Sequence, residues 1–352
     1  MLRTLINILH LSLVHSDNFA VILGTSRYWY NYRHSANALA FYDLLRSNGY
    51  TDSNIILFTA HDHACDCRNI EQGKLFLDSS RTDLYSKNPQ IDFIGEQVTG
   101  EALTKLLSGR NKPFTPRNKR LSITHKDRLL IFFAGHSGEG FMKFQDFREL
   151  PVNDLEMAFG MMEGLGRYKE IFWIADTCKA ATLHDEFTSK NIIALSSSGP
   201  SENSYAHGVD ADLGVLVADR FSYHAMNWLT NIFRNPSRNN ATIADLKKAS
   251  SFSKLGSTTL RDDLSERKAD QVNLKDFFYG NQQHPIKLEY VKVERYRGAL
   301  SPRSRKNEDI MKIYESYGRH VPEKAKESRP WILYVIVTMS VLAVGNSLMY
   351  TT

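Results

Sequence analysis

The chain has 352 residues, of which 42% are hydrophobic and 24% charged, and its formal net charge is +5. These values are typical of a globular protein with enough chain for one large or two smaller α/β domains. Its basic runs at 110–120 and 295–306 lack the regular aromatic interleaving of a nucleic-acid surface, so no nucleic-acid partner is expected. Three cysteines, of which Cys65 and Cys67 are two residues apart, do not make a disulfide framework.

Residues 1–16 predict a secretory signal. Arg3 comes early, an apolar stretch follows from Leu5 to Val14, and Ser16 supplies a small residue at the end. Asn7 and His10 interrupt the apolar stretch, and a short buried helix is the alternative.

Strand-like and helix-like stretches then alternate along the chain. Apolar runs with turn residues at their ends predict strands, and apolar spacing of three to four residues predicts helices. The predicted strands are 19–24, 54–60, the runs before His136 and Cys178, and 191–196. The predicted helices are 35–48, 100–107, 153–165, 216–233 and 242–250. This order predicts one doubly wound α/β domain over 17–290, with a mostly parallel sheet and helices on both faces.

The C-terminal part of the chain predicts a membrane anchor. Residues 291–330 are polar and charged, which indicates a linker, and residues 331–350 contain no charge over a length that can cross a bilayer as a helix. The basic residues before this span would place the domain in the cytosol, whereas a signal at 1–16 would place it in the lumen. We expect the signal to decide the orientation and therefore predict a luminal domain. The sequon at Asn240 agrees with this prediction.

Two of the predicted strands are followed by residues with reactive side chains. The run RLLIFFA leads to His136, and about forty residues later EIFWIAD leads to Cys178. Because parallel strands present their carboxyl ends at one edge of a sheet, a thiol and an imidazole are expected there together. A thiol becomes a good nucleophile once a neighbouring base takes its proton. The alternative for a lone cysteine after a strand is an inert core residue.

Residues beside this pair fit the same chemistry. Gly135 and Gly138 flank His136 and allow a tight turn whose backbone N–H groups stabilise an oxyanion. Asp176 precedes the thiol and is expected to shape its turn, and Lys179 follows it and would favour a thiolate electrostatically.

The region from Phe19 to about Tyr279 resembles the catalytic subunits of glycosylphosphatidylinositol (GPI) transamidases, a family in the legumain-like clan of caspase-fold cysteine peptidases. The segments that carry the resemblance are GTSRYWYNYRHSANALAFYDLLRSNGYTDSNIILF, HDHACDCRN, FTPRNKRL, AGHSGEGFMKFQD, IADTCKA, IIALSSS and LKDFFYG. The motif YNYRH alone would also allow legumain. The GFMKFQD segment and the DTC form of the nucleophile motif are similar to the transamidases.

The resemblance implies roles for particular residues. Cys178 would be the nucleophile, His136 the base, and Asn31 the residue that orients the imidazole. Ser137 and Gly138 would form the oxyanion turn. The substrate pocket would include Arg33, His34, Ser197 and Ser198.

The sequence also departs from the family. A calcium ion would be held by Asp52, the backbone of Ile55 and Asp92, but Gln90 stands where an acidic ligand is expected. Ser137 replaces the usual glycine after the histidine, and Lys179 replaces the usual glutamine after the cysteine. Neither change removes a catalytic side chain, and no cofactor is required for the expected chemistry.

The segment 61–67, HDHACDC, has the ligand types of a zinc site. In an extended conformation its four ligands spread over about 20 Å, too far apart to surround one ion unless the segment folds back. The resemblance implies a different role, in which Cys65 forms a disulfide with a partner subunit.

Together these features predict an endoplasmic-reticulum membrane enzyme with a luminal catalytic domain. It would transfer substrate proproteins with C-terminal signals to the amine of a GPI lipid through a Cys178 thioester, in a complex with other subunits. Two alternatives remain at this stage, a legumain-type peptidase that cleaves after asparagine and a catalytically silent assembly subunit.

Overall fold

The computed structural model describes residues 17–86, 88–235, 240–250 and 258–280. The predicted signal at 1–16, the linker at 291–330 and the membrane span at 331–350 lie outside the described residues. Within the described ranges, no helix is both long and apolar enough to cross a bilayer.

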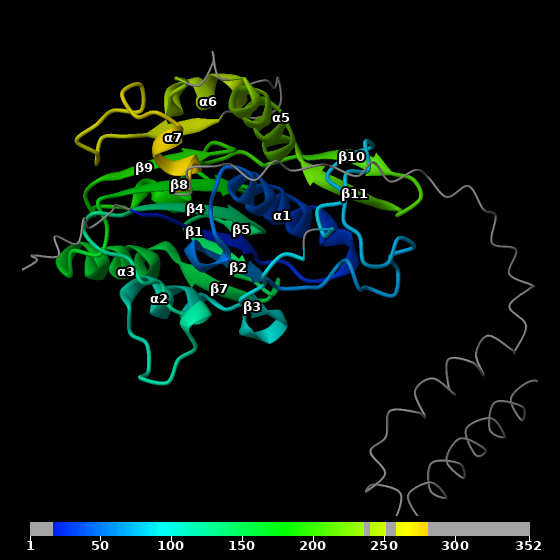
Figure 1. Cartoon of the computed structure of the whole chain (residues 1–352), viewed down its shortest axis with the longest axis horizontal. Coiled ribbons are helices and arrows are strands. Elements are labelled where there is room, and N and C mark those ends of the chain that lie inside the picture. Colours follow the sequence, from blue (N-terminus) through cyan, green and yellow to red (C-terminus); the bar gives the residue numbers. More distant parts are fainter. Residues whose placement is uncertain (1–16, 87, 236–239, 251–257, 281–352) are drawn as a thin grey trace, which may run out of the picture. The chain divides into compact units, whose positions relative to one another are not determined.

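One mixed sheet forms the centre of the domain (Figure 1). Its strand order is β12-β9-β8-β4-β1-β2-β3, with β12 antiparallel to β9 and the other neighbours parallel. Its strands are β1 (Asn18–Gly24), β2 (Ile55–Thr59), β3 (Phe93–Ile94), β4 (Arg128–Ala134), β8 (Glu170–Asp176), β9 (Ile192–Ser196) and β12 (Thr259–Arg261). Nearly all residues of β1, β4 and β8 are buried, because helices cover both faces of a parallel sheet.

Helices pack against both faces of the sheet. The bounds are α1 (Tyr32–Ser47), α2 (Gly100–Ser108), α3 (Val152–Gly164), α4 (Thr182–Asp185), α5 (Arg220–Arg234), α6 (Ile243–Ser250) and α7 (Lys275–Phe278). Side chains from α1, α5, α6 and α7 share one apolar core with one set of alternating strand residues, and α2 and α3 share the other (Figure 1). The mostly parallel α/β fold predicted from the sequence is therefore confirmed.

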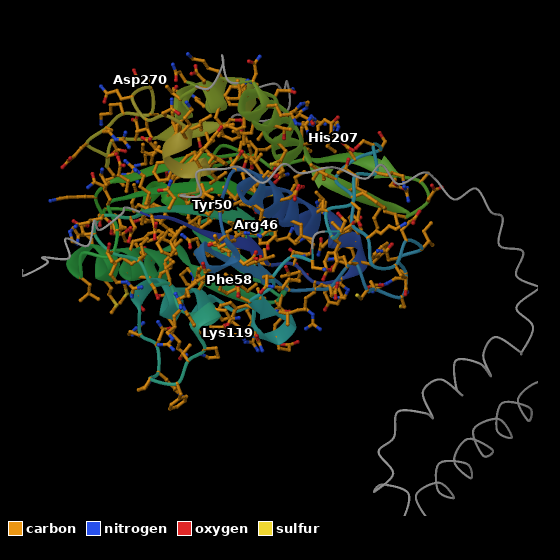
Figure 2. The ribbon with its side chains drawn as sticks, in the orientation of Figure 1. Arg46, Tyr50, Phe58, Lys119, His207 and Asp270 are labelled. Carbon is orange, nitrogen blue, oxygen red and sulfur yellow. The ribbon has the colours of Figure 1, made fainter. Side chains whose placement is uncertain are left out.

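Alternation along each central strand divides the two cores. In β4, Leu130 and Phe132 belong to the core under α1, while Ile131 and Phe133 belong to the core under α2 and α3. Full burial of side chains of this size stabilises the fold by about 1.5–3 kcal/mol each. Figure 2 shows Tyr50 and Phe58 inside the molecule, and Lys119 and Asp270 at its edge.

Two smaller antiparallel sheets lie beyond the central sheet. One consists of β5 (Ser137–Gly138), β6 (Phe141–Phe144) and β7 (Arg148–Pro151), and the other of β10 (Ala206–Asp210) and β11 (Val215–Asp219). The predicted helix over 216–233 is therefore wrong at its start, because 215–219 is a strand and α5 begins at Arg220. The run VLVA explains the difference, because β-branched valines favour a strand over a helix.

Candidate active site

Three neighbouring strands bring the predicted catalytic residues to one edge of the sheet. Ala134 at the end of β4 pairs with Asp176 at the end of β8, and β1 lies on the other side of β4. His136 and Cys178 each lie two residues beyond that pair, and Asn31 ends the 3₁₀ turn that follows β1. The parallel register therefore places the three residues on the same edge, as the sequence predicted.

Asn31 and His136 are hydrogen-bonded. The Nε2 atom of His136 lies 2.9 Å from Oδ1 of Asn31, while Nδ2 of Asn31 donates to the carbonyl of Arg27 at 2.7 Å. That second bond turns the amide oxygen toward the ring. Because an amide oxygen only accepts, the network assigns the ring proton to Nε2 and leaves the lone pair of Nδ1 as the base.

Hydrogen bonds tie the histidine turn to the cysteine turn. The Ser137 hydroxyl donates to the backbone carbonyl of Cys178, and it lies 2.8 Å from the Thr177 hydroxyl. The half-buried thiol of Cys178 lies 3.9 Å from the carbonyl of Ser204. A Cβ at position 138 would collide with the ring of Phe141, so a larger residue there would require this ring to move. The two turns therefore form one connected unit.

Ser197 and Ser198 brace the turn of the nucleophile. Ser197 Oγ accepts from the N–H of Thr177 at 3.1 Å, and Ser198 Oγ donates to the carbonyl of Thr177 at 2.8 Å. Ser198 also accepts from the N–H of Ala180 at 3.0 Å. Both side chains are buried, so their observed contacts hold the turn, and contact with a substrate stays a prediction.

Arg33 and His34 converge on Asp219, a residue that the sequence reasoning missed. Arg33 Nε donates to Asp219 at 3.0 Å, and Asn37 donates to its other oxygen at 2.6 Å. His34 Nε2 lies 3.6 Å from that oxygen. Burial, reinforced by the nearby Asp176, raises the pKa of Asp219 to about 7, and burial lowers the pKa of His34. These residues form a buried polar cluster beside His136.

Asp176 connects the sheet to α5. Its carboxylate accepts from the N–H and hydroxyl of Ser222, in the first turn of α5, and from the hydroxyl of Ser204. An anion is stabilised at this end of a helix, although burial raises the pKa of Asp176. The sequence assigned Asp176 only to the turn before Cys178, because the start of α5 was not predicted.

Lys179 is held by a carboxylate. Its Nζ lies 3.2 Å from Glu139, and both side chains are partly exposed. The backbone of Lys179 has φ 49°, in the left-handed region, and its N–H donates to the carbonyl of Glu202 at 2.7 Å. An exposed pair of this kind is worth about 0–1 kcal/mol. The positive charge that was expected beside the thiolate is therefore partly neutralised by Glu139.

The predicted calcium ligands line one cavity of about 260 Å³, where Oδ1 of Asp52 and both carboxylate oxygens of Asp92 have protein partners. Asp52 accepts from Tyr42 and, at 3.1 Å, from Arg46. Asp92 accepts from the N–H of Leu57 and from Asn118. Arg117 and Arg120 also line the cavity. Calcium needs six to eight oxygens, so the residues present do not fit it.

Side chains of the 61–67 segment have protein partners. His61 Nε2 lies 2.6 Å from Asp66, and the buried His63 lies between the Ser35 hydroxyl and the Tyr28 carbonyl. In the part of the chain that the structure describes, no cluster of three metal-binding side chains was found. Cys65 and Cys67 are exposed and not paired with each other.

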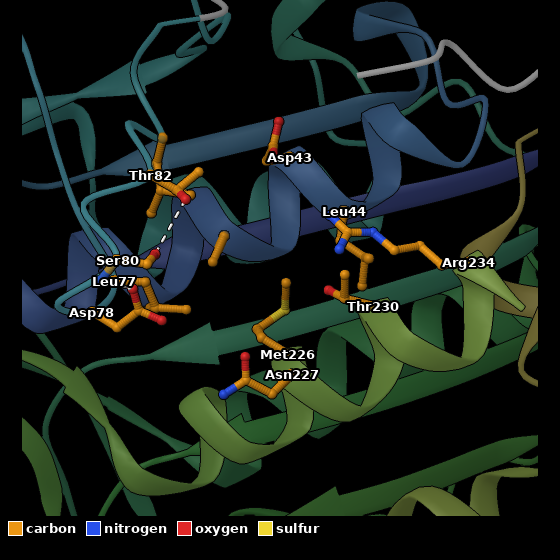
Figure 3. Close-up of a pocket in the computed structure, with 12 residues that line it drawn as sticks. Asp43, Leu44, Leu77, Asp78, Ser80, Thr82, Met226, Asn227, Thr230 and Arg234 are labelled. Carbon is orange, nitrogen blue, oxygen red and sulfur yellow. Dashed lines mark hydrogen bonds between the residues drawn. The ribbon is translucent and has the colours of Figure 1, made fainter. Parts of the chain in front are cut away.

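A cavity of about 430 Å³ lies away from these residues, between α1, α5 and the segment 77–84 (Figure 3). Apolar side chains such as Leu44 and Met226 line it together with Asp43, Asp78 and Arg234. None of the predicted site residues lines this cavity.

Sequence comparisons relate this chain to a known family of proteins. A model of the Peptidase C13 family matches residues 18–251. A protein of Saccharomyces cerevisiae named GPI-anchor transamidase is 39% identical over 77% of this chain and 66% of its own. Proteins with the same name from Schizosaccharomyces pombe and Homo sapiens are 38% and 36% identical, over 79% and 80% of this chain and 73% and 71% of their own. A caspase-1 crystal structure from Spodoptera frugiperda aligns with a TM-score of 0.41 and 10% identity, over 76% of this chain and 91% of that one.

A thiol and an imidazole at the carboxyl edge of an α/β sheet, with an amide bonded to the imidazole, are the arrangement of a cysteine peptidase. The family match extends over more than half of the chain, and the chain belongs to the Peptidase C13 family. The resemblance found in the sequence is thereby confirmed.

Proposed function

We propose that this chain is the catalytic subunit of a GPI transamidase. The observation that carries the proposal is the 2.9 Å bond from His136 to Asn31, at the edge where β8 delivers Cys178. The relatives named GPI-anchor transamidase support the same activity over more than three quarters of the chain.

The chemistry follows from the tautomer of His136. Its Nδ1 takes the proton of the Cys178 thiol, and the sulfur attacks the carbonyl of the residue that will carry the anchor. Backbone N–H groups of the Ser137–Gly138 turn stabilise the oxyanion. As the C–N bond breaks, the imidazolium returns its proton to the amine of the departing C-terminal peptide, and a thioester remains.

A second amine completes the reaction. The ethanolamine amine of a GPI lipid attacks the thioester, and His136 takes a proton from that amine. The C–S bond breaks as the new amide forms, and the imidazolium returns the proton to the sulfur to regenerate the thiol. Burial lowers the pKa of His136, which keeps the imidazole neutral and able to accept a proton near neutral pH.

The cellular setting is part of the proposal. A signal at 1–16 and a span at 331–350 would hold a luminal domain at the endoplasmic-reticulum membrane. The exposed position of Cys65 suits a disulfide with another subunit of the complex. Arg33 and His34 would contact the substrate, and Ser197 and Ser198 would flank it.

Replacement of the two reacting groups tests the function. Cys178→Ala and His136→Ala should abolish surface display of a GPI-anchored reporter in cells that lack the endogenous subunit. Cys67→Ala and His125→Ala, both at exposed positions, should restore display and serve as matched controls. Normal display with Cys178→Ala would refute the proposal, and cleavage of a short asparagine peptide without partner subunits would favour a legumain-type peptidase instead.

A further inference from the structure

We propose that Asp146 is a positioning residue for the Cys178–His136 pair, because its carboxylate orients the amide of Asn31 and places a negative charge beside the imidazole. The inference rests on the proposed function, since it deals with the same proton transfer. Asp146 ends the segment GFMKFQD and was assigned no role from the sequence.

The two oxygens of Asp146 have different surroundings. Oδ2 accepts from the backbone N–H of Arg27 at 2.8 Å and from Nδ2 of Asn31 at 3.2 Å. Oδ1 lies 3.8 Å from Nε2 of His136 and is buried without a hydrogen-bond partner among the described residues. A buried carboxylate oxygen without a partner is costly, so its position beside the ring needs an explanation.

The orientation of Asn31 decides which ring nitrogen is the base. Its Nδ2 faces two acceptors, the Asp146 carboxylate and the Arg27 carbonyl, so a flipped amide would place oxygen against oxygen at both contacts. A flipped amide would also donate to Nε2 of His136 and move the ring proton to Nδ1. The ring would then be unable to take the thiol proton through Nδ1, and Asp146 therefore helps to exclude the unproductive tautomer.

The backbone at this position is held in an uncommon conformation. Gln145 and Asp146 have φ of 59° and 65°, in the left-handed region, which is unfavourable for a residue with a side chain. Gln145 anchors the turn, because its N–H donates to the carbonyl of Thr25 at 2.8 Å and its side chain donates to that of Val98 at 3.1 Å. Strain of this kind concentrates at functional sites, where surrounding contacts hold it.

The other charged groups around His136 show why the Asp146 carboxylate is needed. The ring is faced by Arg33 and His34 from α1, by Lys143 from β6 and by Asp146 from the turn after β6. Arg33 and Lys143 disfavour an imidazolium, whereas Asp146 favours it. The imidazolium that forms when the thiol loses its proton is thus stabilised by Asp146.

Two substitutions separate orientation from charge. Asp146→Asn keeps the size, tolerates the left-handed backbone and can still accept from Asn31, so it removes mainly the charge. Asp146→Gly can adopt the same left-handed backbone conformation and removes the whole carboxylate. Glu149→Gln, at an exposed position of β7, removes a charge from the same hairpin and is the matched control.

The readout is alkylation of Cys178 by iodoacetamide, measured against pH by mass spectrometry of its peptide, with the full chain in the assembled complex in membranes. Asp146→Asn should move the midpoint of the rate to higher pH by about one unit, a fall of about tenfold near neutral pH, and Asp146→Gly at least as far. Glu149→Gln should leave the midpoint in place.

An unmoved midpoint in Asp146→Asn, or an equal movement in Glu149→Gln, would overturn the inference. So would a loss of alkylation that is matched by a lower unfolding temperature of the complex. Alkylation involves no transamidation, so a negative result in this experiment does not affect the Cys178→Ala anchoring test. Anchoring that survived Cys178→Ala would instead remove the proposed function.

Discussion

The Ser137 hydroxyl donates a hydrogen bond to the backbone carbonyl of Cys178, and so joins the turn after β4 to the turn after β8. These residues are 41 positions apart in the chain. The bond fixes the spacing between the imidazole and the thiol through the backbone rather than through the reacting side chains. Ser137 stands where glycine was expected, so this chain has a contact that glycine could not make.

Ser137→Gly should lower the free energy of unfolding by about 1 kcal/mol, because the partly buried hydrogen bond to Cys178 is lost. We expect a fall in transamidation of only a few fold, since no reacting group is removed. Thermal unfolding of the purified complex and a reporter assay would measure the two effects. An unchanged unfolding temperature would mean that the bond contributes nothing to stability.

Lys179→Gln should move the pH dependence of Cys178 alkylation less than Asp146→Asn does. The reason is that the Lys179 ammonium is paired with Glu139 and partly exposed, so solvent and the carboxylate screen its charge. Glu139→Gln is the matched control, because it frees the ammonium and should increase alkylation near neutral pH. A larger shift with Lys179→Gln than with Asp146→Asn would contradict this prediction.

Asp219→Asn should change how stability depends on pH. The pKa of Asp219 is raised to about 7 from the ordinary value near 3.8, so the folded state holds a proton that the unfolded state has lost between these two pH values. Stability therefore falls as pH rises through this window. The unfolding temperature of the variant minus that of the native chain should therefore be larger at pH 8 than at pH 5. A difference that stays constant between these pH values would contradict the prediction.

Calcium should not stabilise the protein through Asp52 and Asp92. A site with a dissociation constant a thousandfold below the calcium concentration would add about 4 kcal/mol, or several degrees in the unfolding temperature. We expect a change of less than about 1 °C between calcium and EDTA, since Arg46 and Asn118 already bond these carboxylates. A rise of several degrees with calcium that Asp92→Asn abolished would contradict the prediction.

Much of the fold could be predicted from local patterns. The apolar runs of β1, β2, β4, β8 and β9 are bounded by turn residues, and α2 begins at a capping Thr99 and ends before a left-handed Gly109. The short hairpins could not, because β5, β7 and β10 are not apolar runs, and β11 continues into α5 with no turn residue between them. The strand at 215–219 was assigned to a helix for this reason.

For the candidate active site, the sequence alone was enough to predict the pair and its place in the fold. His136 and Cys178 follow two apolar runs, and any parallel sheet brings such positions to one edge. The sequence resemblance added Asn31 and the family, and the comparisons confirmed the family.

Only the tertiary structure decided what surrounds that pair. Asp146 meets Asn31 across 115 positions, and Asp219 meets Arg33 across 186. Such polar contacts follow no period in the sequence, because they depend on the order of strands in the sheet and on turns of uncommon backbone geometry. Cys178 was placed by its own strand, whereas the groups that control its proton were placed by the rest of the fold.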